Sequence, residues 1–308
     1  MNPAQELAQY AQDAPTLLTL GVFDGVHRGH LALIDTLKQR AGERGLLPGV
    51  VTFSPHPVEV LHPGATLPLL VSVEERLRLL KLAGVPLVIL LTFTRELSRL
   101  GPEEFVRSLV DNVKMRGLVL GPDFSLGRDR EGTVDALGTL GEHLGFTVED
   151  IAAHTMDGRV VSSTAIRGAL SRGDVTDAAR MLGRPFSLSG PVVTTSRRGE
   201  SLGFRTANLV TDTGRALPAN GVYATIATIP NGQFGSVTNV GHRPTFGDTE
   251  RIVETHILDF SGDLYGATLT VEFIARIRDE IAFQDPQALI AQIHRDVEAA
   301  RGILGERV

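Results

Sequence analysis

The stretch GVFDGVHRGH, residues 21–30, joins an apolar run to a segment with helical periodicity. The run LLTLGVF (17–23) predicts a buried strand, and residues 29–44 predict a helix. Glycines at such a turn let backbone N–H groups approach a ligand, and the helix N-terminus adds partial positive charge. His27 and His30, three residues apart, lie near that terminus on roughly one face. The stretch therefore predicts a strand–turn–helix unit that can hold phosphate.

The first half of the chain repeats this alternation of short apolar strands and helices. Further strands are predicted at 49–53, 86–93 and 117–121, and further helices at 72–84, 102–113 and 134–145. Such alternation is typical of βαβ units with a parallel sheet and right-handed connections. We therefore expect a Rossmann-like sheet with helices, and ligands at the carboxyl ends of its strands.

The second half changes to strands without helices between them. The predicted strands are SLSGPVV, GVYATIATI, FGSVTNV, RIVETHILDF and ATLTVEFIARI. They favour an antiparallel barrel or sandwich. One long helix follows at 285–304, with Asp285 as N-cap and Pro286 in its first position. A Gly/Pro/Ser-rich link near 183–190 predicts domains at residues 1–185 and 186–308.

Composition limits the classes of protein to consider. The chain has 308 residues, 42% of them apolar, a formal net charge of −6 and no cysteine. The acidic balance argues against a nucleic-acid binder, and the missing cysteines exclude disulfides and thiolate metal sites. No apolar run is long enough to cross a bilayer, and no basic signal region precedes the first strand. We expect a cytoplasmic enzyme without nucleic-acid or membrane partners.

Three readings of the two histidines remain open: metal ligands, buried structural groups and phosphate ligands. Zinc would need a third ligand, and the spacing differs from HEXXH. The segment SSTAIR (162–167) adds three hydroxyls and Arg167 at the start of another helix, which suits phosphate but also an ordinary cap. The loop GPDFSLGRDREG (121–132) is either a ligand loop or a surface turn. GxxxxGK[ST] and GxGxxG are both absent, which argues against P-loop NTPases and dinucleotide dehydrogenases.

A second candidate site lies in the β-rich half. Thr206 and Asn208 are two apart, so in an extended segment they share a face and offer neutral oxygen ligands for Mg²⁺. In IVETHILDF (252–260), alternation puts Glu254 on a face expected to point inward. A carboxylate there is costly unless it is paired or used as a base. The competing readings are a turn for the first pair and a solvated strand edge for Glu254.

Four motifs in order, GVFDGVHRGH, TFSPHP (52–57), GPDFSLGRDREG and SSTAIR, resemble the adenylyltransferase half of bacterial bifunctional riboflavin kinase/FAD synthetases. The resemblance implies a nucleotidyltransferase domain in which ATP and FMN give FAD and pyrophosphate with Mg²⁺. It implies that His27, His30 and Arg167 act in catalysis, while Asp123 and Phe124 contact flavin. The ATP- and phosphate-binding residues that it implies are Gly21, Phe23, Asp24, Gly29, Ser162, Ser163 and Thr164. Leu126 departs from the aromatic residue expected there.

In the second half, PANGVYA, TNVGHRPTFG, VETHILDFSGDLYG and RDEIAF resemble the riboflavin kinase half of the same family. That resemblance implies a small antiparallel barrel that phosphorylates riboflavin with ATP. Thr206 and Asn208 would bind Mg²⁺, and Glu254 would be the base. Arg278 would lie near the flavin, and Gly199 would belong to a phosphate-binding loop. Arg205 stands where the family reads proline.

The leading hypothesis is therefore a bifunctional enzyme whose ligands are riboflavin, FMN, FAD and ATP. The alternative is a monofunctional FAD synthetase with a degenerate, flavin-binding C-terminal barrel. The altered FRTAN segment (204–208) and the altered glycine-rich loop (192–203) motivate this alternative.

Overall fold

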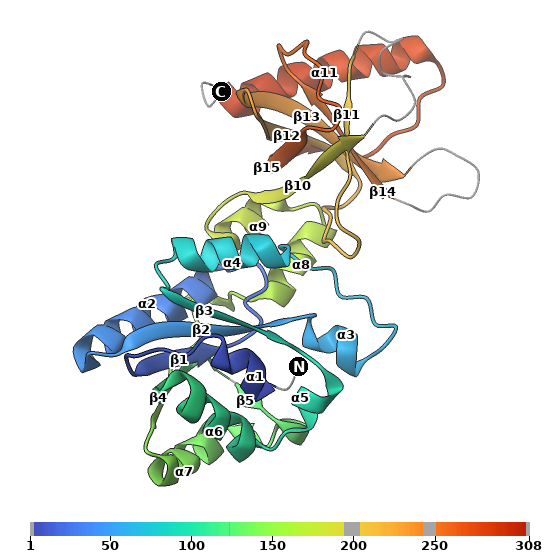
Figure 1. Ribbon diagram of the computed structural model, residues 1–308. Helices are drawn as coiled ribbons and strands as arrows, with labels where there is room; N and C mark the ends of the chain where they lie inside the picture. The colour runs from blue at the N-terminus through green and yellow to red at the C-terminus, as the bar shows by residue number, and fades with distance from the viewer. Residues whose placement is uncertain (1–2, 123, 194–203, 243–250, 306–308) are drawn as a thin grey trace. The chain divides into compact units, whose positions relative to one another are not determined.

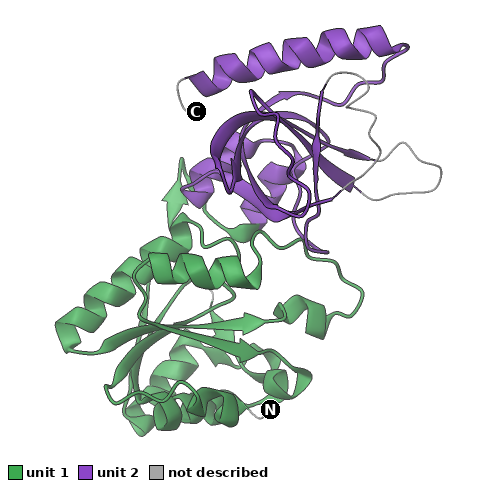
Figure 2. Ribbon diagram, turned by 45° about the horizontal axis from the view of Figure 1, so that its top comes forward, with its two compact units in different colours: residues 1–163 green, residues 164–308 purple. Residues whose placement is uncertain are grey.

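A computed structural model describes residues 3–122, 124–193, 204–242 and 251–305. The chain forms two compact units, Met1–Ser163 and Thr164–Val308, which are coloured separately in Figure 2. Within the described residues, no helix combines the length and the apolar character that crossing a bilayer requires.

The first unit contains a five-stranded parallel sheet in the order β3-β2-β1-β4-β7. The strands are β1 (Thr16–Leu20), β2 (Leu47–Ser54), β3 (Leu87–Thr92), β4 (Met115–Leu120) and β7 (Thr147–Asp150). The parallel sheet is confirmed, and β7 is an additional edge strand. Because the strand order reverses between β1 and β4, their carboxyl ends form the switch point where ligands bind in such sheets.

Helices cover both faces of this sheet (Figure 1). The described helices of the first unit are α1 (Pro3–Ala8), α2 (Arg28–Arg44), α3 (Pro57–Leu61), α4 (Val73–Leu82), α5 (Arg95–Arg99), α6 (Pro102–Val113) and α7 (Val134–Leu144). Short pairs β5 (Ser125–Leu126) with β6 (Gly132–Thr133) and β8 (Thr155–Met156) with β9 (Arg159–Val160) lie in its loops, as does the 3₁₀ turn Arg128–Arg130.

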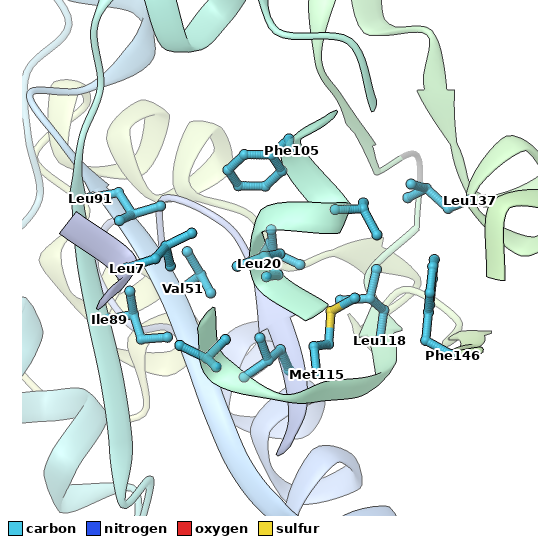
Figure 3. Packing of buried hydrophobic residues seen from close by; sticks show 14 of the residues in the cluster. Leu7, Leu20, Val51, Ile89, Leu91, Phe105, Met115, Leu118, Leu137 and Phe146 are labelled. Atoms are coloured by element: carbon cyan, nitrogen blue, oxygen red, sulfur yellow. The ribbon is translucent and has the colours of Figure 1, made fainter. Parts of the chain in front are cut away.

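Two apolar clusters lie on opposite faces of the sheet. Leu17 faces the side chains of α2 and α4, whereas its neighbour Leu18 faces a cluster with α1, α5, α6 and α7. Figure 3 shows the second cluster, in which Phe105 of α6 and Met115 of β4 pack with strand side chains. Burial on both faces explains why a central strand such as β1 does not alternate between buried and exposed residues.

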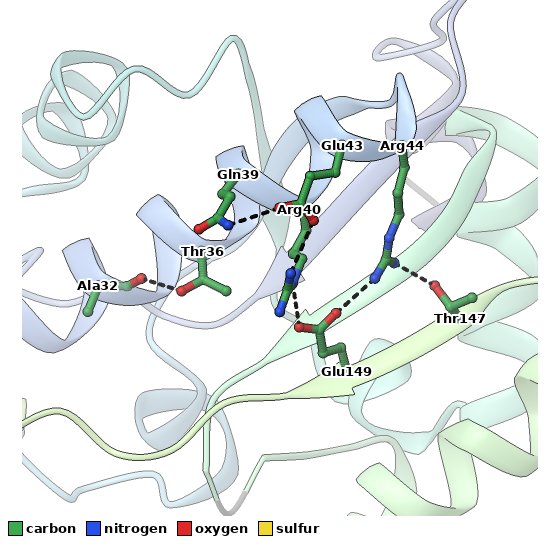
Figure 4. Close-up of polar contacts among 8 residues, drawn as sticks. All are labelled: Ala32, Thr36, Gln39, Arg40, Glu43, Arg44, Thr147 and Glu149. Carbon is green, nitrogen blue, oxygen red and sulfur yellow. Dashed lines mark hydrogen bonds and ion pairs between the residues drawn. The ribbon is translucent and has the colours of Figure 1, made fainter.

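Polar contacts attach α2 to the edge strand β7 (Figure 4). Arg40 donates to Glu149 at 2.7 Å, and Arg44 donates to the same carboxylate at 2.8 Å and to Thr147 at 3.0 Å. Charged side chains on an edge strand also discourage pairing with another chain.

The second unit contains a closed barrel in the order β10-β11-β14-β13-β12-β15. The strands are β10 (Phe186–Val193), β11 (Ala207–Leu209), β12 (Gly221–Ile229), β13 (Gly232–His242), β14 (Arg251–Ile257) and β15 (Thr268–Arg278). All their pairings are antiparallel, so the expected barrel is confirmed. The short strand β11 was not among the predicted strands.

Helix α11 (Pro286–Leu304) follows the barrel, and Asp285 accepts from the backbone N–H of Ala288 at 2.8 Å, as expected for an N-cap. Its Ala300 and Leu304 pack with Val222 and Val237 on the outer barrel face. The inner face instead carries a fully buried hydroxyl chain. It runs from Ser236 through Thr225 and Thr238 to Thr255, with O–O distances of 2.7, 2.8 and 3.0 Å.

Helices α8 (Ser163–Ser171) and α9 (Val175–Leu182) precede the barrel. The N–H of Ala219 donates to the carbonyl of Leu170 at 2.8 Å. Arg276 of β15 donates to the carbonyl of Asn220 at 2.6 Å and to that of Arg172 at 3.4 Å. The turn after α8 is thereby attached to the PANG segment of the barrel.

Candidate functional sites

The turn after β1 has an unusual backbone. Phe23, Gly25 and Val26 have φ angles of 55°, 87° and 41°, in the region that non-glycine residues seldom adopt. Phe23 is 2% exposed, and a Cβ at Gly21 would lie 3.1 Å from its ring. The missing side chain at Gly21 therefore leaves room for Phe23, whose ring centroid lies 4.9 Å from that of His30.

His27 and His30 cap the helix α2 reciprocally. His27 Nδ1 accepts from the backbone N–H of His30, and His30 Nδ1 accepts from the backbone N–H of His27, both at 3.3 Å. The two rings stack with centroids 3.6 Å apart and planes 16° from parallel. The arrangement is a capping box built from two imidazoles, and it fixes both rings at the helix N-terminus.

These contacts determine where the ring protons lie. A nitrogen that accepts a hydrogen bond carries no proton, so each neutral ring must carry its proton on Nε2. Desolvation and, secondarily, the neighbouring His27 hold the pKa of His30 well below its usual 6.5. At neutral pH, His30 is therefore an uncharged ring with an Nε2–H donor, and the geometry gives His27 the same tautomer.

Gly29 supports the pair. A Cβ at this position would lie 3.1 Å from Cε1 and Nδ1 of His27 and 3.2 Å from the carbonyl oxygen of Val161. The glycine predicted from the motif to let phosphate approach is thus also needed for packing against the His27 ring.

Asp24 is 4% exposed, and its carboxylate is directed at backbone N–H groups. It accepts from Leu70 N at 2.9 and 3.1 Å and from Val71 N at 3.3 Å. Its own carbonyl accepts from the Ser163 hydroxyl at 2.8 Å. Asp24 thereby joins the turn after β1 to the segment before α4 and to Ser163.

Arg76 was missed in the sequence and supports the same turn. It is 5% exposed and donates to the carbonyls of Val22 and Phe53, at 2.8 Å each. Desolvation lowers the pKa of its guanidinium, although the Asp24 carboxylate acts in the opposite direction. The available signal was its helical spacing, because Arg76 and the buried Leu80 lie four residues apart on one face of α4.

The remaining predicted residues of this site are distributed as follows. Ser162 and Ser163 end the first unit, and Thr164 and Arg167 lie in α8 at the beginning of the second. Phe124 is partly buried against the first-unit core. Asp123 lies outside the described residues.

In the barrel, three polar residues form a cross-strand row on its outer face. Asn208 of β11 pairs with Glu254 of β14, which pairs on its other side with Asn239 of β13. Asn208 is 8% exposed, and its buried Oδ1 has no hydrogen-bond partner in the structure. Thr206 is exposed and precedes β11 by one residue. The register thus brings together Asn208 and Glu254, and it adds Asn239.

The expected orientation of β14 was wrong. Its buried residues are Val253, Thr255 and Ile257, whereas Glu254 and His256 are half-buried on the outer face. The alternation in the sequence does not decide which of the two faces of β14 is buried. Because Ile252 is apolar, the outer face was interpreted as the core face. Glu254 is therefore accessible to a substrate without the full cost of a buried charge.

Arg278 lies at the end of β15, and its guanidinium faces α11. It donates to Asp296 through Nε at 2.9 Å and Nη2 at 2.7 Å, and to the carbonyl of Asp279 at 2.8 Å. Asp296 is 2% exposed. The residue predicted to lie near the flavin thus attaches α11 to the barrel. Gly199 lies outside the described residues.

Two family models match successive parts of the chain. A family model described as FAD synthetase matches residues 9–165, and one described as riboflavin kinase matches residues 182–304. Two curated relatives are bifunctional riboflavin kinase/FMN adenylyltransferases. The chain is 41% identical to that of Pseudomonas fluorescens, with 92% of each chain covered. It is 36% identical to that of Escherichia coli K12, with 97% and 96% covered.

A solved structure described as a macrolide-efflux protein from Streptococcus pneumoniae has a TM-score of 0.88 to this chain. The two are 31% identical, and 96% of each chain is covered. The likeness extends to both units.

Proposed function

The chain belongs to the family of bifunctional riboflavin kinase/FMN adenylyltransferases, and on this premise we propose that it converts riboflavin to FAD in two steps. The riboflavin kinase half transfers the γ-phosphoryl group of ATP to riboflavin and yields FMN. The FAD synthetase half transfers the adenylyl group of a second ATP to FMN and yields FAD and pyrophosphate. We assign these activities to residues 186–308 and 1–185. The two family matches leave 166–181 between them.

For adenylyl transfer, a phosphate oxygen of FMN attacks the α-phosphorus of ATP, and the bond to pyrophosphate breaks. We propose that His27 and His30 donate their Nε2–H groups to the ATP phosphates. Support comes from the reciprocal caps, which leave Nε2 as the protonated nitrogen on each ring. Further phosphate contacts are proposed for Ser162, Ser163, Thr164 and Arg167, and for the turn that contains Gly21, Phe23 and Gly29.

Asp24 was predicted to bind ATP or phosphate, but we propose a supporting role for it. Its backbone contacts support a role for Asp24 in holding the phosphate-binding turn, because a carboxylate beside ATP phosphates would repel them. Asp123, Phe124 and Arg278 remain proposed flavin-side residues. The contacts of Arg278 with Asp296 favour an indirect part through the segment that follows it.

For phosphoryl transfer, we propose that Glu254 accepts the proton of the ribityl 5′-hydroxyl as that oxygen attacks the γ-phosphorus and ADP leaves. Thr206 and Asn208 suit Mg²⁺, because the buried Oδ1 of Asn208 has no hydrogen-bond partner among the described residues and a cation would satisfy it. Among the described residues, no group of three or more His, Asp or Glu could hold a metal. Neutral oxygens would then share the ion with phosphate, and the bound ion would neutralise charge on the transferred phosphoryl group.

The observation that carries the proposal is the presence of two separate constellations, the imidazole pair at α2 and the Asn208–Glu254 row, in the order of the two matched families. The test is incubation of the purified chain with riboflavin, ATP and Mg²⁺, with the flavins separated by chromatography. We expect FMN first and FAD later. Formation of FAD from FMN without formation of FMN from riboflavin would support the monofunctional alternative.

Glu254→Gln separates the two activities. The substitution removes a proton acceptor and keeps the shape of the side chain, so FMN formation should fall by roughly 10²–10⁴-fold. FAD formation from added FMN should be unchanged and serves as the internal control for folding and concentration. Equal loss of both activities would contradict the assignment of separate sites.

A further inference from the structure

The segment that leads into β11 is fixed by side chains and not by strand pairing. Only Ala207–Leu209 belong to the strand, with Ala207 opposite Thr255 and Asn208 opposite Glu254. The described residues just before it, Phe204–Thr206, have no strand assignment. A strand of three residues leaves Thr206 outside the ladder, so other contacts must determine where its side chain points.

One such contact comes from His256 of β14. Its Nδ1 lies 2.8 Å from the backbone carbonyl oxygen of Arg205. A carbonyl oxygen can only accept, so Nδ1 must be the donor. This bond lies one residue before Thr206, at the point where the backbone ladder ends. His256 also shares the outer strand face with Glu254, two residues away.

Aromatic contacts hold the neighbouring residue. The ring of Phe204 meets the ring of His256 edge to face, with centroids 5.5 Å apart, and that of His294 on α11, with centroids 5.1 Å apart. The guanidinium of Arg205 donates to the carbonyl of Ser261 at 3.2 Å. Both residues before the exposed Thr206 are therefore attached to other parts of the barrel unit.

We propose that His256 is a positioning residue for the kinase reaction, holding the Thr206–Asn208 segment in register with Glu254 so that the metal-binding oxygens and the base face the same phosphate. The inference rests on the proposed kinase function. His256 touches neither metal nor substrate and acts through the carbonyl of Arg205. Preorganisation of this kind lowers the cost of ordering the ligands when the metal–nucleotide complex binds.

Two substitutions separate the hydrogen bond from the ring contact. His256→Phe keeps an aromatic ring beside Phe204 and removes the donor. His256→Asn removes the ring and keeps an N–H donor at the same distance along the side chain. His294→Phe is the matched control, because it alters the other ring that touches Phe204 without touching the Arg205 carbonyl.

The affinity for metal is measured without turnover, by titrating Mn²⁺ in the presence of ADP and following free Mn²⁺ by electron paramagnetic resonance. We expect His256→Phe to weaken Mn²⁺ binding about fivefold, the effect of one net hydrogen bond, and to raise the Mg²⁺ requirement of FMN formation in parallel. His256→Asn and His294→Phe should stay within about twofold of the wild type. FAD formation from FMN should be unchanged in all three.

Hydrogen exchange at the amides of Ala207–Leu209 provides a readout independent of activity, and His256→Phe should accelerate it. Wild-type exchange and Mn²⁺ affinity in His256→Phe would overturn the positioning role and leave the kinase assignment intact. Equal weakening in His256→Phe and His256→Asn would also overturn it, because the donor would then be irrelevant. A wild-type chain that forms no FMN would instead overturn the proposed function, and the exchange experiment would still test whether the hydrogen bond from His256 orders the segment.

Discussion

Replacing His27 by asparagine separates its role as helix cap from its proposed role as a hydrogen-bond donor to phosphate. His27 is the N-cap of α2, and its Nδ1 accepts from the N–H of His30 at 3.3 Å. Asparagine is among the best N-cap residues, and its Oδ1 can accept the same bond. Asparagine lacks the imidazole ring, which carries Nε2–H and whose centroid lies 3.6 Å from that of the His30 ring. His27→Ala removes both the cap and the ring.

The two variants should differ in stability but not in activity. Loss of an N-cap costs about 1 kcal/mol, so His27→Ala should destabilise the first unit by about that amount, while His27→Asn should stay within a few tenths. A hydrogen bond to a charged phosphate is worth about 1.5–3 kcal/mol, so both variants should lose roughly 10- to 150-fold in FAD synthesis.

FAD synthesis is assayed from added FMN, and FMN formation from riboflavin on the same chain serves as the measure of protein concentration. Local stability is followed by hydrogen exchange of peptides from α2. If His27→Asn kept wild-type FAD synthesis, the imidazole would be only a cap, and the proposed use of Nε2–H would be wrong. If it lost stability as His27→Ala does, the capping geometry would be wrong instead.

Two further predictions concern charge. Because the folded pKa of His30 is lowered, the unfolded chain takes up a proton near pH 6.5 and the folded one does not, so the first unit should lose stability as the pH falls below about 6.5. The proton resonance of the His30 ring should accordingly titrate well below pH 6.5, and titration at or above that value would contradict the reciprocal caps. Asp296→Asn should speed hydrogen exchange throughout α11, because breaking a buried ion pair costs about 3–5 kcal/mol. Asp259→Asn breaks the exposed pair with Arg301 on the same helix and should change little, whereas equal effects would mean that burial does not decide the strength of these pairs.

The sequence predicted the architecture well where periodicity is strong. Parallel strands buried on both faces are continuous apolar runs, and β1, β2, β3 and β4 have that pattern. The edge strand β7, TVED, is four residues long and not buried, so it has no such pattern. Strand β11 has only three residues and is defined by its pairing with β10 and β14. The local sequence contains no signal for such pairing.

Candidate site residues were predictable when a motif carried them, and their supporting residues were not. The pair His27 and His30 was evident from spacing at a predicted helix start, and the structure adds their mutual caps and their tautomers. Arg76 and His256 act on backbone carbonyls far away in the sequence: those bound by Arg76 lie 54 and 23 residues away, and the one bound by His256 lies 51 residues away. Such contacts depend on tertiary packing, and side-chain types and spacing do not reveal them.

Arg205 shows how a departure from the family pattern is accommodated. A proline would fix φ at this position in the folded and unfolded chain alike, and part of its effect would be a smaller loss of entropy on folding. Arginine cannot do this, and here its carbonyl is bonded by His256 and its guanidinium by the carbonyl of Ser261. These contacts exist only in the folded barrel. Order in the Thr206–Asn208 segment therefore depends on β14 and the loop after it, which links the proposed metal ligands to the same strand that carries Glu254.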